Sequence, residues 1–398
     1  MPAEAHEAGG GAKVPGKLRV ERVDGEARLA ALIPAWRALA TEAAEKNQLM
    51  EPAMALPAWR HVEGGTGIGW LFVWRNGNRE TNRERLIAVM ALANRPPSPG
   101  LPFRTAEVWR HGLGYLGTPL IHRRHVEEAV SAVLDWLQAR GHGPRLLRLR
   151  QVGAEGPIYA AFRGALAARG LPLMEFERHR HACLSSDQSG ALYLRAALGR
   201  KRLKEYRRLE KRLAEKGALS FQPVTDEDGI ERAAEDFLKL EQSGWKGRRG
   251  TALAQDAHSL AFFREMMAGL VEERGVRMVR LMLGDRALAV AVLLVSGDEA
   301  WLWKIAFDEV YARFSPGAQL VVALTGALLD GGEFRLVDSC AAPDHPMIDH
   351  IWRERIAITD ALAVIRPGVL PPGAIFATVR AARAAQAAAK TFLAGLRR

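Results

Sequence analysis

The alternation of apolar and polar positions predicts a mixed α/β protein in which one order of elements occurs twice. The order is clearer in the second half of the chain. Residues 218–224 alternate as a strand, and two segments, 226–243 and 259–275, carry apolar residues at helical spacing. Three apolar strands then follow over 276–283, 287–295 and 300–307. The tight turns between these three strands predict an antiparallel meander.

The rest of the second half, and the whole first half, extend the same order. After the meander the pattern predicts a helix over 315–329, a strand over 334–339 and a final strand over 356–365. The first half repeats this series with weaker turn signals, from a strand at 17–23 to a long strand at 171–184. We therefore predict a tandem duplication, with one copy over 18–185 and the other over 186–370.

The two ends of the chain differ from this pattern. Residues 1–17 mix Gly, Ala, Pro and charge without periodicity, so we expect disorder there. Residues 371–398 form an Ala-rich segment after a Pro-Pro pair and predict a helix that docks on the body. The alternative is that this helix makes weak contact with a membrane surface. We rank it lower because the apolar face of the helix is thin.

Composition and charge narrow the classes of function. The chain has 398 residues, of which 48% are hydrophobic, and a formal net charge of +11. Its longest apolar run, 287–295, is far shorter than a membrane span, and the N-terminus does not resemble a signal peptide, so we expect a cytoplasmic protein. The two cysteines, Cys183 and Cys340, exclude a disulfide framework and a cysteine-rich zinc site. The basic excess predicts an anionic partner: nucleic acid, an acidic membrane or a phosphate-rich cofactor.

The strand-to-helix junction at 301–320, WLWKIAFDEVYARFSPGAQL, carries the first candidate chemistry. Simple alternation places Trp301, Trp303, Ile305 and Phe307 on one face of the strand, and Lys304 with Asp308 on the other. The helix that follows has Ser315 as an expected N-cap, Pro316 in its first turn and Gly317 where a ligand can approach the backbone. A helix start of this kind binds phosphate, although Ser-Pro-Gly also begins helices that bind nothing.

Three sequence blocks bring a family into view. KLEQSGWKGRRGTAL, KIAFDEVYARFSPGAQL and LVDSCAAPDHPMIDHIW, together with the element order, resemble the GNAT acyltransferase fold. The two-copy arrangement is similar to the Fem-type peptidyltransferases and to the CelD-type acetyltransferases of cellulose and exopolysaccharide biosynthesis, with the CelD type as the better match. The resemblance implies tandem GNAT-like domains, each with a mixed, largely antiparallel sheet flanked by helices. It covers the second half strongly and the first half by element order only.

The resemblance also implies a cofactor and a seat for it. GNAT enzymes use acetyl-CoA or another acyl-CoA and hold its pyrophosphate at this junction, which here corresponds to Arg313, Ser315, Pro316, Gly317 and Ala318. The junction is poorer in glycine than the usual signature. The first copy has GYLGTPL at the equivalent place, with Thr118 and Pro119 as a similar helix start, and we expect that copy to be structural or substrate-binding.

Acyl transfer needs a base for the acceptor, donors for the oxyanion and an acid for the thiolate. We expect Asp308 and Asp338 to converge on one cleft, with Asp338 the preferred base or substrate anchor and Tyr311 a candidate acid. His345 is a further candidate base, and either aspartate could instead cap a turn. Cys340, His345 and Asp349 also supply the residue types of a covalent mechanism, which we rank lower because neighbours in sequence seldom converge. No second histidine stands at helical spacing from His345, so we expect no metal.

The remaining motifs are a glycine-rich loop and a basic helix. Glu241, Trp245 and Lys246 are candidates for binding an anionic or sugar-like acceptor, together with Lys304 and Cys340; an exposed turn with a docked Trp is the alternative. The segment 194–216 predicts a helix rich in Lys and Arg. These side chains could attract the phosphates of coenzyme A or of tRNA, or the helix could be a solvated connection between the halves. We therefore expect an acyl-CoA-dependent N- or O-acyltransferase acting on a sugar, amine or small metabolite. A Fem-like transferase using aminoacyl-tRNA and a non-catalytic partner in polysaccharide biosynthesis are the alternatives.

Overall fold

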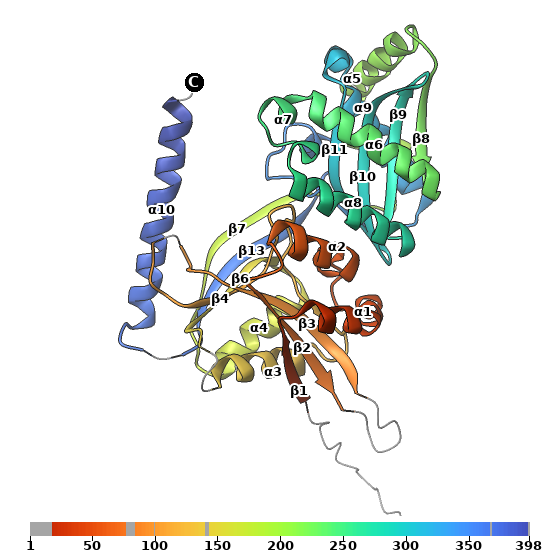
Figure 1. Ribbon diagram of the computed structural model, residues 1–398. Helices are drawn as coiled ribbons and strands as arrows, with labels where there is room; N and C mark the ends of the chain where they lie inside the picture. Colours follow the sequence, from red (N-terminus) through yellow and green to blue (C-terminus); the bar gives the residue numbers. More distant parts are fainter. Residues whose placement is uncertain (1–17, 77–83, 99, 140–142, 367, 397–398) are drawn as a thin grey trace, which may run out of the picture.

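The computed structural model describes residues 18–76, 84–98, 100–139, 143–366 and 368–396 (Figure 1). The disorder expected for residues 1–17 lies outside these ranges. The predicted mixed α/β architecture is confirmed, because a large mixed sheet is flanked by helices. Among the described residues, no helix is both long and apolar enough to cross a membrane.

The first half follows the predicted order of elements. Its strands are β1 (Leu18–Val23), β2 (Ile68–Arg75), β3 (Arg85–Asn94), β4 (Thr105–Val108), β5 (Leu120–Ile121), β6 (Leu146–Gly153) and β7 (Leu173–Leu184). Its helices are α1 (Glu26–Thr41), α2 (Pro52–Pro57), α3 (Val126–Gln138) and α4 (Pro157–Ala168), with short turns η1 (Gln48–Met50) and η2 (Ala58–Val62).

The second half repeats that order. Its strands are β8 (Leu219–Val224), β9 (Val276–Leu283), β10 (Arg286–Ser296), β11 (Glu299–Phe307), β12 (Leu336–Asp338) and β13 (Glu354–Val364). Its helices are α5 (Gly190–Ala214), α6 (Glu227–Ser243), α7 (Trp245–Arg248), α8 (Ala257–Glu272), α9 (Pro316–Gly331) and α10 (Pro372–Leu396), with turns η3 (Leu253–Gln255), η4 (Glu309–Phe314) and η5 (Ile348–His350). The predicted meander is present as β9, β10 and β11, paired antiparallel.

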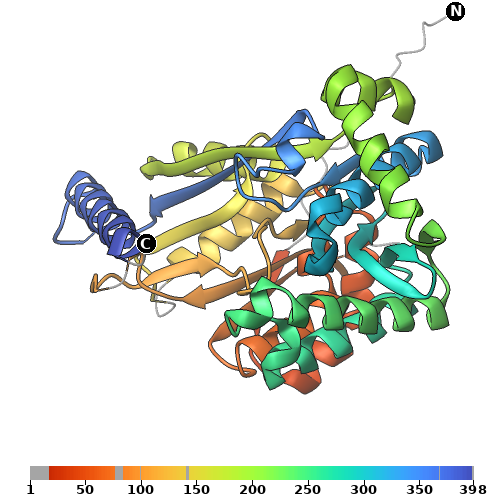
Figure 2. The same cartoon turned by 90° about the horizontal axis from the view of Figure 1, so that it is seen from above.

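The two copies exchange their last strands. The sheet order is β1-β2-β3-β4-β6-β13-β7-β12-β11-β10-β9-β8, with β5 paired to β3. Strand β13, the last of the second copy, pairs with β6 of the first copy, and β7, the last of the first copy, pairs with β12 of the second. The two exchanged strands pair with each other at the centre. The order of elements thus repeats along the sequence, but one sheet continues through both copies (Figures 1 and 2).

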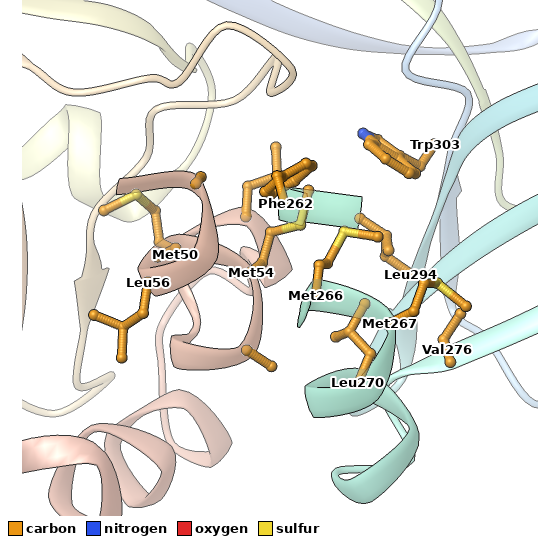
Figure 3. Packing of buried hydrophobic residues seen from close by; sticks show 14 of the residues in the cluster. Met50, Met54, Leu56, Phe262, Met266, Met267, Leu270, Val276, Leu294 and Trp303 are labelled. Carbon is orange, nitrogen blue, oxygen red and sulfur yellow. The ribbon is translucent and has the colours of Figure 1, made fainter. Parts of the chain in front are cut away.

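A second contact between the copies comes from their helices. Met54 of the first copy lies beside Phe262 and Met266 on α8 of the second, and Met50 belongs to the same apolar cluster (Figure 3). The cluster extends to Trp303 on β11. Flexible Met side chains fill irregular gaps, which suits them to this contact between the two copies.

Two helices extend beyond the layered core. Helix α5 covers the predicted basic segment, but it is kinked at Gly199, whose φ of 68° is left-handed and interrupts the helix. Helix α10 lies at the edge of the molecule in both views and is anchored by the fully buried Ile375 and Val379 against Leu146 and Leu362 (Figures 1 and 2).

Candidate active site

Strand β11 contains a bulge that the alternation pattern did not reveal. In the pairing with β10, Val292 faces Lys304 and Leu293 faces Leu302, so Trp303 is an extra residue. A bulge inverts the alternation beyond it. The expected grouping of Trp301 and Trp303 with Ile305 and Phe307 is therefore wrong. Both tryptophans pack with the α6 and α8 side of the sheet, whereas Ile305 and Phe307 pack on the α9 side.

The bulge lies where β11 separates from its neighbour. Strands β11 and β12 are parallel and pair only from Glu299 opposite Leu336 to Trp301 opposite Asp338. Strand β12 ends at Asp338, while β11 continues to Phe307. The described strands therefore leave an open seam beside β11 from Leu302 onward, with unpaired backbone groups at the bulge. This is the splay that an oxyanion site on β11 requires.

Asp338, at the vertex of the seam, is buried and has a partner that sequence reasoning missed. Its Oδ1 lies 2.7 Å from Nε2 of His181 and accepts a hydrogen bond of 2.8 Å from the Cys340 N–H. His181 is on the exchanged strand β7 and is also buried. Burial lowers the pKa of His181, but the hydrogen bond and charge of Asp338 outweigh it, so the net shift is upward.

Cys340 and Tyr115 extend this cluster. The Cys340 thiol faces the hydroxyl of Tyr115, which comes from the loop after β4 in the first copy. Burial raises the pKa of the Cys340 thiol well above its ordinary value, with a further contribution from Asp338. A raised thiol pKa opposes formation of the thiolate that covalent catalysis needs.

His345 does not join the cluster. Its Nδ1 accepts weak hydrogen bonds from the Met347 and Ile348 N–H groups, at 3.3 and 3.4 Å. The ring therefore caps the turn that follows it in the chain. Asp349 instead lies 3.5 Å from Arg355. The sequence neighbours Cys340, His345 and Asp349 are thus held by different partners.

Asp308 and Asp338 do not converge, which corrects the expectation from sequence. Asp338 lies opposite Trp301, whereas Asp308 follows the end of β11, seven positions further along. At about 3.3 Å per residue the two are roughly 20 Å apart. Asp308 is buried, accepts the Val310 N–H at 3.0 Å and pairs with Arg286 at 2.6 Å. Tyr311 lies beside it, under the guanidinium of Arg286 at 5.3 Å. Asp308 and Tyr311 therefore have their partners at the end of β11, away from Asp338.

The start of α9 matches the predicted anion seat in part. Ser315 is the N-cap residue of α9, as expected, but its backbone is left-handed, with φ 52° and ψ 53°, and its side chain makes no capping hydrogen bond. The N–H groups of Gly317 and Ala318 precede the first intrahelical bond, from Gln319 N to Ser315 O, and are not capped. Gly317 is buried, and a Cβ there would lie 3.3 Å from Phe307.

Basic side chains surround this helix start. Arg313, in the last turn of η4, is exposed and lies over the Phe314 ring at 4.8 Å, and Lys216 lies over the same ring at 6.0 Å. Helix α5 packs along α9, with its N-terminal Gly190 donating to Asp330 near the C-terminal end of α9. The basic second half of α5 then runs toward Phe314, against which Leu213 packs.

The candidate acceptor residues Glu241, Lys246 and Lys304 come together. Glu241 is buried on α6, and its Oε1 accepts from Lys246 Nζ at 2.7 Å and lies 3.6 Å from Lys304 Nζ. Its Oε2 accepts the Leu253 N–H at 2.8 Å. The two ammonium groups and this hydrogen bond outweigh desolvation and lower the pKa of Glu241. Burial, and then the charge of Lys246, lower the pKa of Lys304 to about 8.

Trp245 forms one wall of a hollow next to this cluster. The hollow is lined by Leu240, Glu241, Gly244, Trp245, Lys246, Ile305, Ala306, Phe307 and Glu309. Trp245 is 46% exposed, and its backbone N–H donates to Glu309 at 2.7 Å. The α7 turn requires Gly247, because a Cβ would lie 1.6 Å from the Gln242 carbonyl oxygen. The hollow therefore follows the free side of β11 from the Lys246 region toward η4.

The corresponding junction of the first copy is closed. Thr118 and Pro119 do not begin a helix, since β5 follows them and α3 starts at Val126. Gly117 donates to the Gln151 carbonyl at 2.8 Å, and a Cβ on Gly117 would lie 2.3 Å from the Arg150 oxygen. The loop between β4 and β5 thus packs directly on β6, where the second copy has its open seam.

Comparisons with known proteins agree with this geometry. Residues 200–345 match the model of the acetyltransferase (GNAT) domain family, and this matched part of the chain contains the open seam, the α9 start and the hollow. No curated protein matches the sequence. Among the described residues, no group of three or more His, Cys, Asp or Glu is arranged to hold a metal ion.

Solved structures extend the likeness to both copies. A structure of FemX is similar with a TM-score of 0.51 and 13% identity over 87% of this chain and 97% of that one. A tandem GNAT protein from the clavulanic acid biosynthesis pathway has 17% identity, covers 89% of this chain and all of its own, and has a TM-score of 0.43. The C-terminal domain of a putative lysylphosphatidylglycerol synthetase from Agrobacterium fabrum has a TM-score of 0.49 and 13% identity. The match covers 85% of this chain and 93% of that one. At this identity, the likeness to FemX shows a shared fold.

Proposed function

We propose that the protein is an acyl-CoA-dependent acyltransferase that moves an acyl group from the thioester to an amine or hydroxyl. The observation that carries the proposal is the open seam between β11 and β12, with the uncapped start of α9 further along β11, inside the matched GNAT domain. Acetyl-CoA is the expected donor. The CelD-like blocks favour an acceptor that is a sugar, an amine or another small metabolite.

In this proposal the pyrophosphate binds the N–H groups of Gly317 and Ala318 at the start of α9. A helix N-terminus with free donors favours an anion, and Arg313 and the basic half of α5 add positive charge nearby. The pantetheine arm then extends along the free side of β11, and the thioester carbonyl lies against the backbone N–H groups near the Trp303 bulge. Those groups stabilise the oxyanion as the acceptor attacks.

Proton transfer is assigned to the vertex of the seam. Asp338, held by His181, is the proposed base or acceptor anchor, and the raised pKa of His181 suits a pair that shares one proton. Asp308, Tyr311 and His345 take structural roles in the proposal, because each is engaged with partners elsewhere. The first copy, with its closed junction, serves as a scaffold that supplies Tyr115 and His181.

A second candidate function is transfer from aminoacyl-tRNA. The observation that favours it is the basic surface of α5, where Arg195, Arg200, Lys204 and Arg207 line an open groove. Such a groove suits phosphates, and the salt dependence of binding would reveal it. A non-catalytic role in polysaccharide synthesis stays as the third alternative.

The proposal is tested by isothermal titration of the purified protein with acetyl-CoA. We expect saturable binding by the wild type and at least tenfold weaker binding by Gly317→Asp, which sets a carboxylate against the phosphate seat. Gly317→Asn is the neutral control for the contact with Phe307, and Gly331→Asp places the same charge at the other end of α9, where a Cβ meets nothing. Absence of heat from acetyl-CoA and longer acyl-CoA would reject the proposal, and specific binding of charged tRNA would then support the second candidate.

A further inference from the structure

Lys304 is one of the candidate residues for binding the acyl acceptor, and its neighbours neutralise its ammonium charge only in part. Its Nζ lies 3.6 Å from Glu241 Oε1, which is longer than a hydrogen bond. Lys246 holds the same oxygen at 2.7 Å, and Leu253 N–H occupies the other one. A single carboxylate therefore serves two ammonium groups. Lys304 has the longer contact with it, and its Nζ also lies over the Trp303 ring at 5.2 Å.

Burial makes this arrangement costly. The side chain of Lys304 is 17% exposed and that of Glu241 is 2% exposed, so water screens the excess positive charge weakly. Other charged groups around the hollow do not cancel it. Glu309 lies on η4 and is engaged by the Trp245 N–H and by Arg248 at 2.6 Å, and Arg249 lies over the Trp245 ring at 5.1 Å.

The hollow lies next to this cluster. Lys246 and Glu241 line it, Trp245 forms an exposed aromatic wall, and Ala306 lines it on the β11 side. A ligand with an anionic group and a flat or apolar body matches these surfaces. The anion would accept from both ammonium groups, while the body stacks on the indole.

We infer that the acceptor carries a small anionic group, a carboxylate or a phosphate, which binds between Lys246 and Lys304 and fixes the nucleophile beside the β11 bulge. The inference rests on the proposed function for the identity of the ligand as an acceptor. The binding of an anion by the two lysines does not depend on acyl-CoA.

The test follows the lysines directly. The chain has eleven lysines, so NMR of protein labelled with ¹³C at lysine Cε gives few signals, and Lys304→Arg and Lys246→Arg assign the two that matter. The probes are sodium phosphate and sodium acetate at constant ionic strength. We expect both signals to shift saturably with one shared dissociation constant, and the pKa of Lys304 to rise from about 8 by about one unit. Lys46, held by the Ala40 and Thr41 carbonyls, is the internal reference.

Two variants separate binding from mere support of the fold. Lys304→Gln should weaken the anion-induced shift of Lys246 at least tenfold, and Glu241→Gln, which removes the competing anion but keeps the acceptor for Leu253, should strengthen binding severalfold. Saturation by phosphate alone or acetate alone identifies the anion. A Lys304 signal that moves only linearly with Lys46, or weaker binding in both variants, would overturn the inference. Acetyl-CoA binding without anion binding rejects this inference alone, and anion binding without acetyl-CoA binding rejects the proposed function alone.

Discussion

His181 on β7 and Asp338 on β12 lie 2.7 Å apart and join the two copies of the repeat at a buried polar contact. The contact exists because the exchanged strand β7 enters the sheet of the second copy, where Cys183 pairs with Asp338. The candidate site of the second copy is therefore completed by a residue of the first. A single copy of the repeat would lack it.

Replacement of His181 should make stability depend on pH in a defined direction. The pKa of His181 is raised in the folded state, so its stabilising effect is complete below the unfolded value of about 6.5 and is lost as pH rises through the folded value. We expect His181→Gln to lower the free energy of unfolding by about 1–3 kcal/mol at pH 6, with a smaller loss at pH 9.

Urea unfolding at both pH values measures this difference. The matched control is His179→Gln, on the same strand, whose half-buried ring lies 6.1 Å from that of His181. An equal loss at pH 6 and pH 9 would mean that the interaction with Asp338 does not depend on the charge of the imidazole.

The strand exchange predicts that neither copy is stable alone. A chain ending at residue 187 lacks β13, which separates β6 from β7, and a chain beginning at 188 lacks β7 between β12 and β13. Each half would also expose its part of the Met50, Met54 and Phe262 cluster.

We expect each half to aggregate when produced separately and a soluble 1:1 complex when both are produced together. Gel filtration and circular dichroism of the three preparations measure this. A monomeric half with a cooperative thermal transition would show that the exchange is not required for folding.

Asp308 should behave as a structural residue. It pairs with the half-exposed Arg286 and caps the Val310 N–H, so Asp308→Asn keeps one acceptor and loses the charge. We expect a loss of about 1 kcal/mol in the free energy of unfolding and acetyl-CoA binding within twofold of the wild type. Asp338→Asn tests the proposed catalytic assignment in the same assay, and with a known acceptor it should lower turnover at least a hundredfold without a similar change in acetyl-CoA affinity. A large loss of turnover in Asp308→Asn instead would contradict the roles given to the two aspartates.

The sequence predicts the repeat well because its elements follow period 2 or period 3.6 over long stretches. The meander, α9 and the grouping of Glu241 with Lys246 need only local information. The exchange of β7 and β13 cannot be predicted from local information, because the exchanged and the unexchanged strand pairings bury the same apolar faces. The Trp303 bulge shifts the alternation without a glycine to mark it, so Lys304 was placed on the wrong face relative to Trp303. His181 stands in the charged run ERHRHACL, where alternation with the buried Cys183 was the one signal that it faces inward.

Two glutamates near the contact between the copies, the half-buried Glu45 and the buried Glu51, should reduce stability at neutral and higher pH. Glu45 accepts the Ile158 N–H at 2.8 Å, and Glu51 accepts from the Ser296 hydroxyl on β10 of the other copy. Burial raises the pKa of each carboxyl to about 7. Both are therefore protonated in the folded protein at pH 5 and ionised at pH 8. Their favourable contribution is complete below the unfolded value and is lost as pH rises through about 7.

Replacement by glutamine should remove this dependence. We expect Glu45→Gln and Glu51→Gln each to raise the free energy of unfolding by about 1–3 kcal/mol at pH 8 and to change it little at pH 5, because the amide keeps the acceptor oxygen without ionising. Thermal unfolding of both variants from pH 5 to pH 8 measures the effect, with the exposed Glu231→Gln as control. A variant that is less stable than the wild type at pH 8 would mean that the ionised carboxylate is held by favourable partners. In that case Glu51 would join the two copies by charge rather than by a shared hydrogen bond.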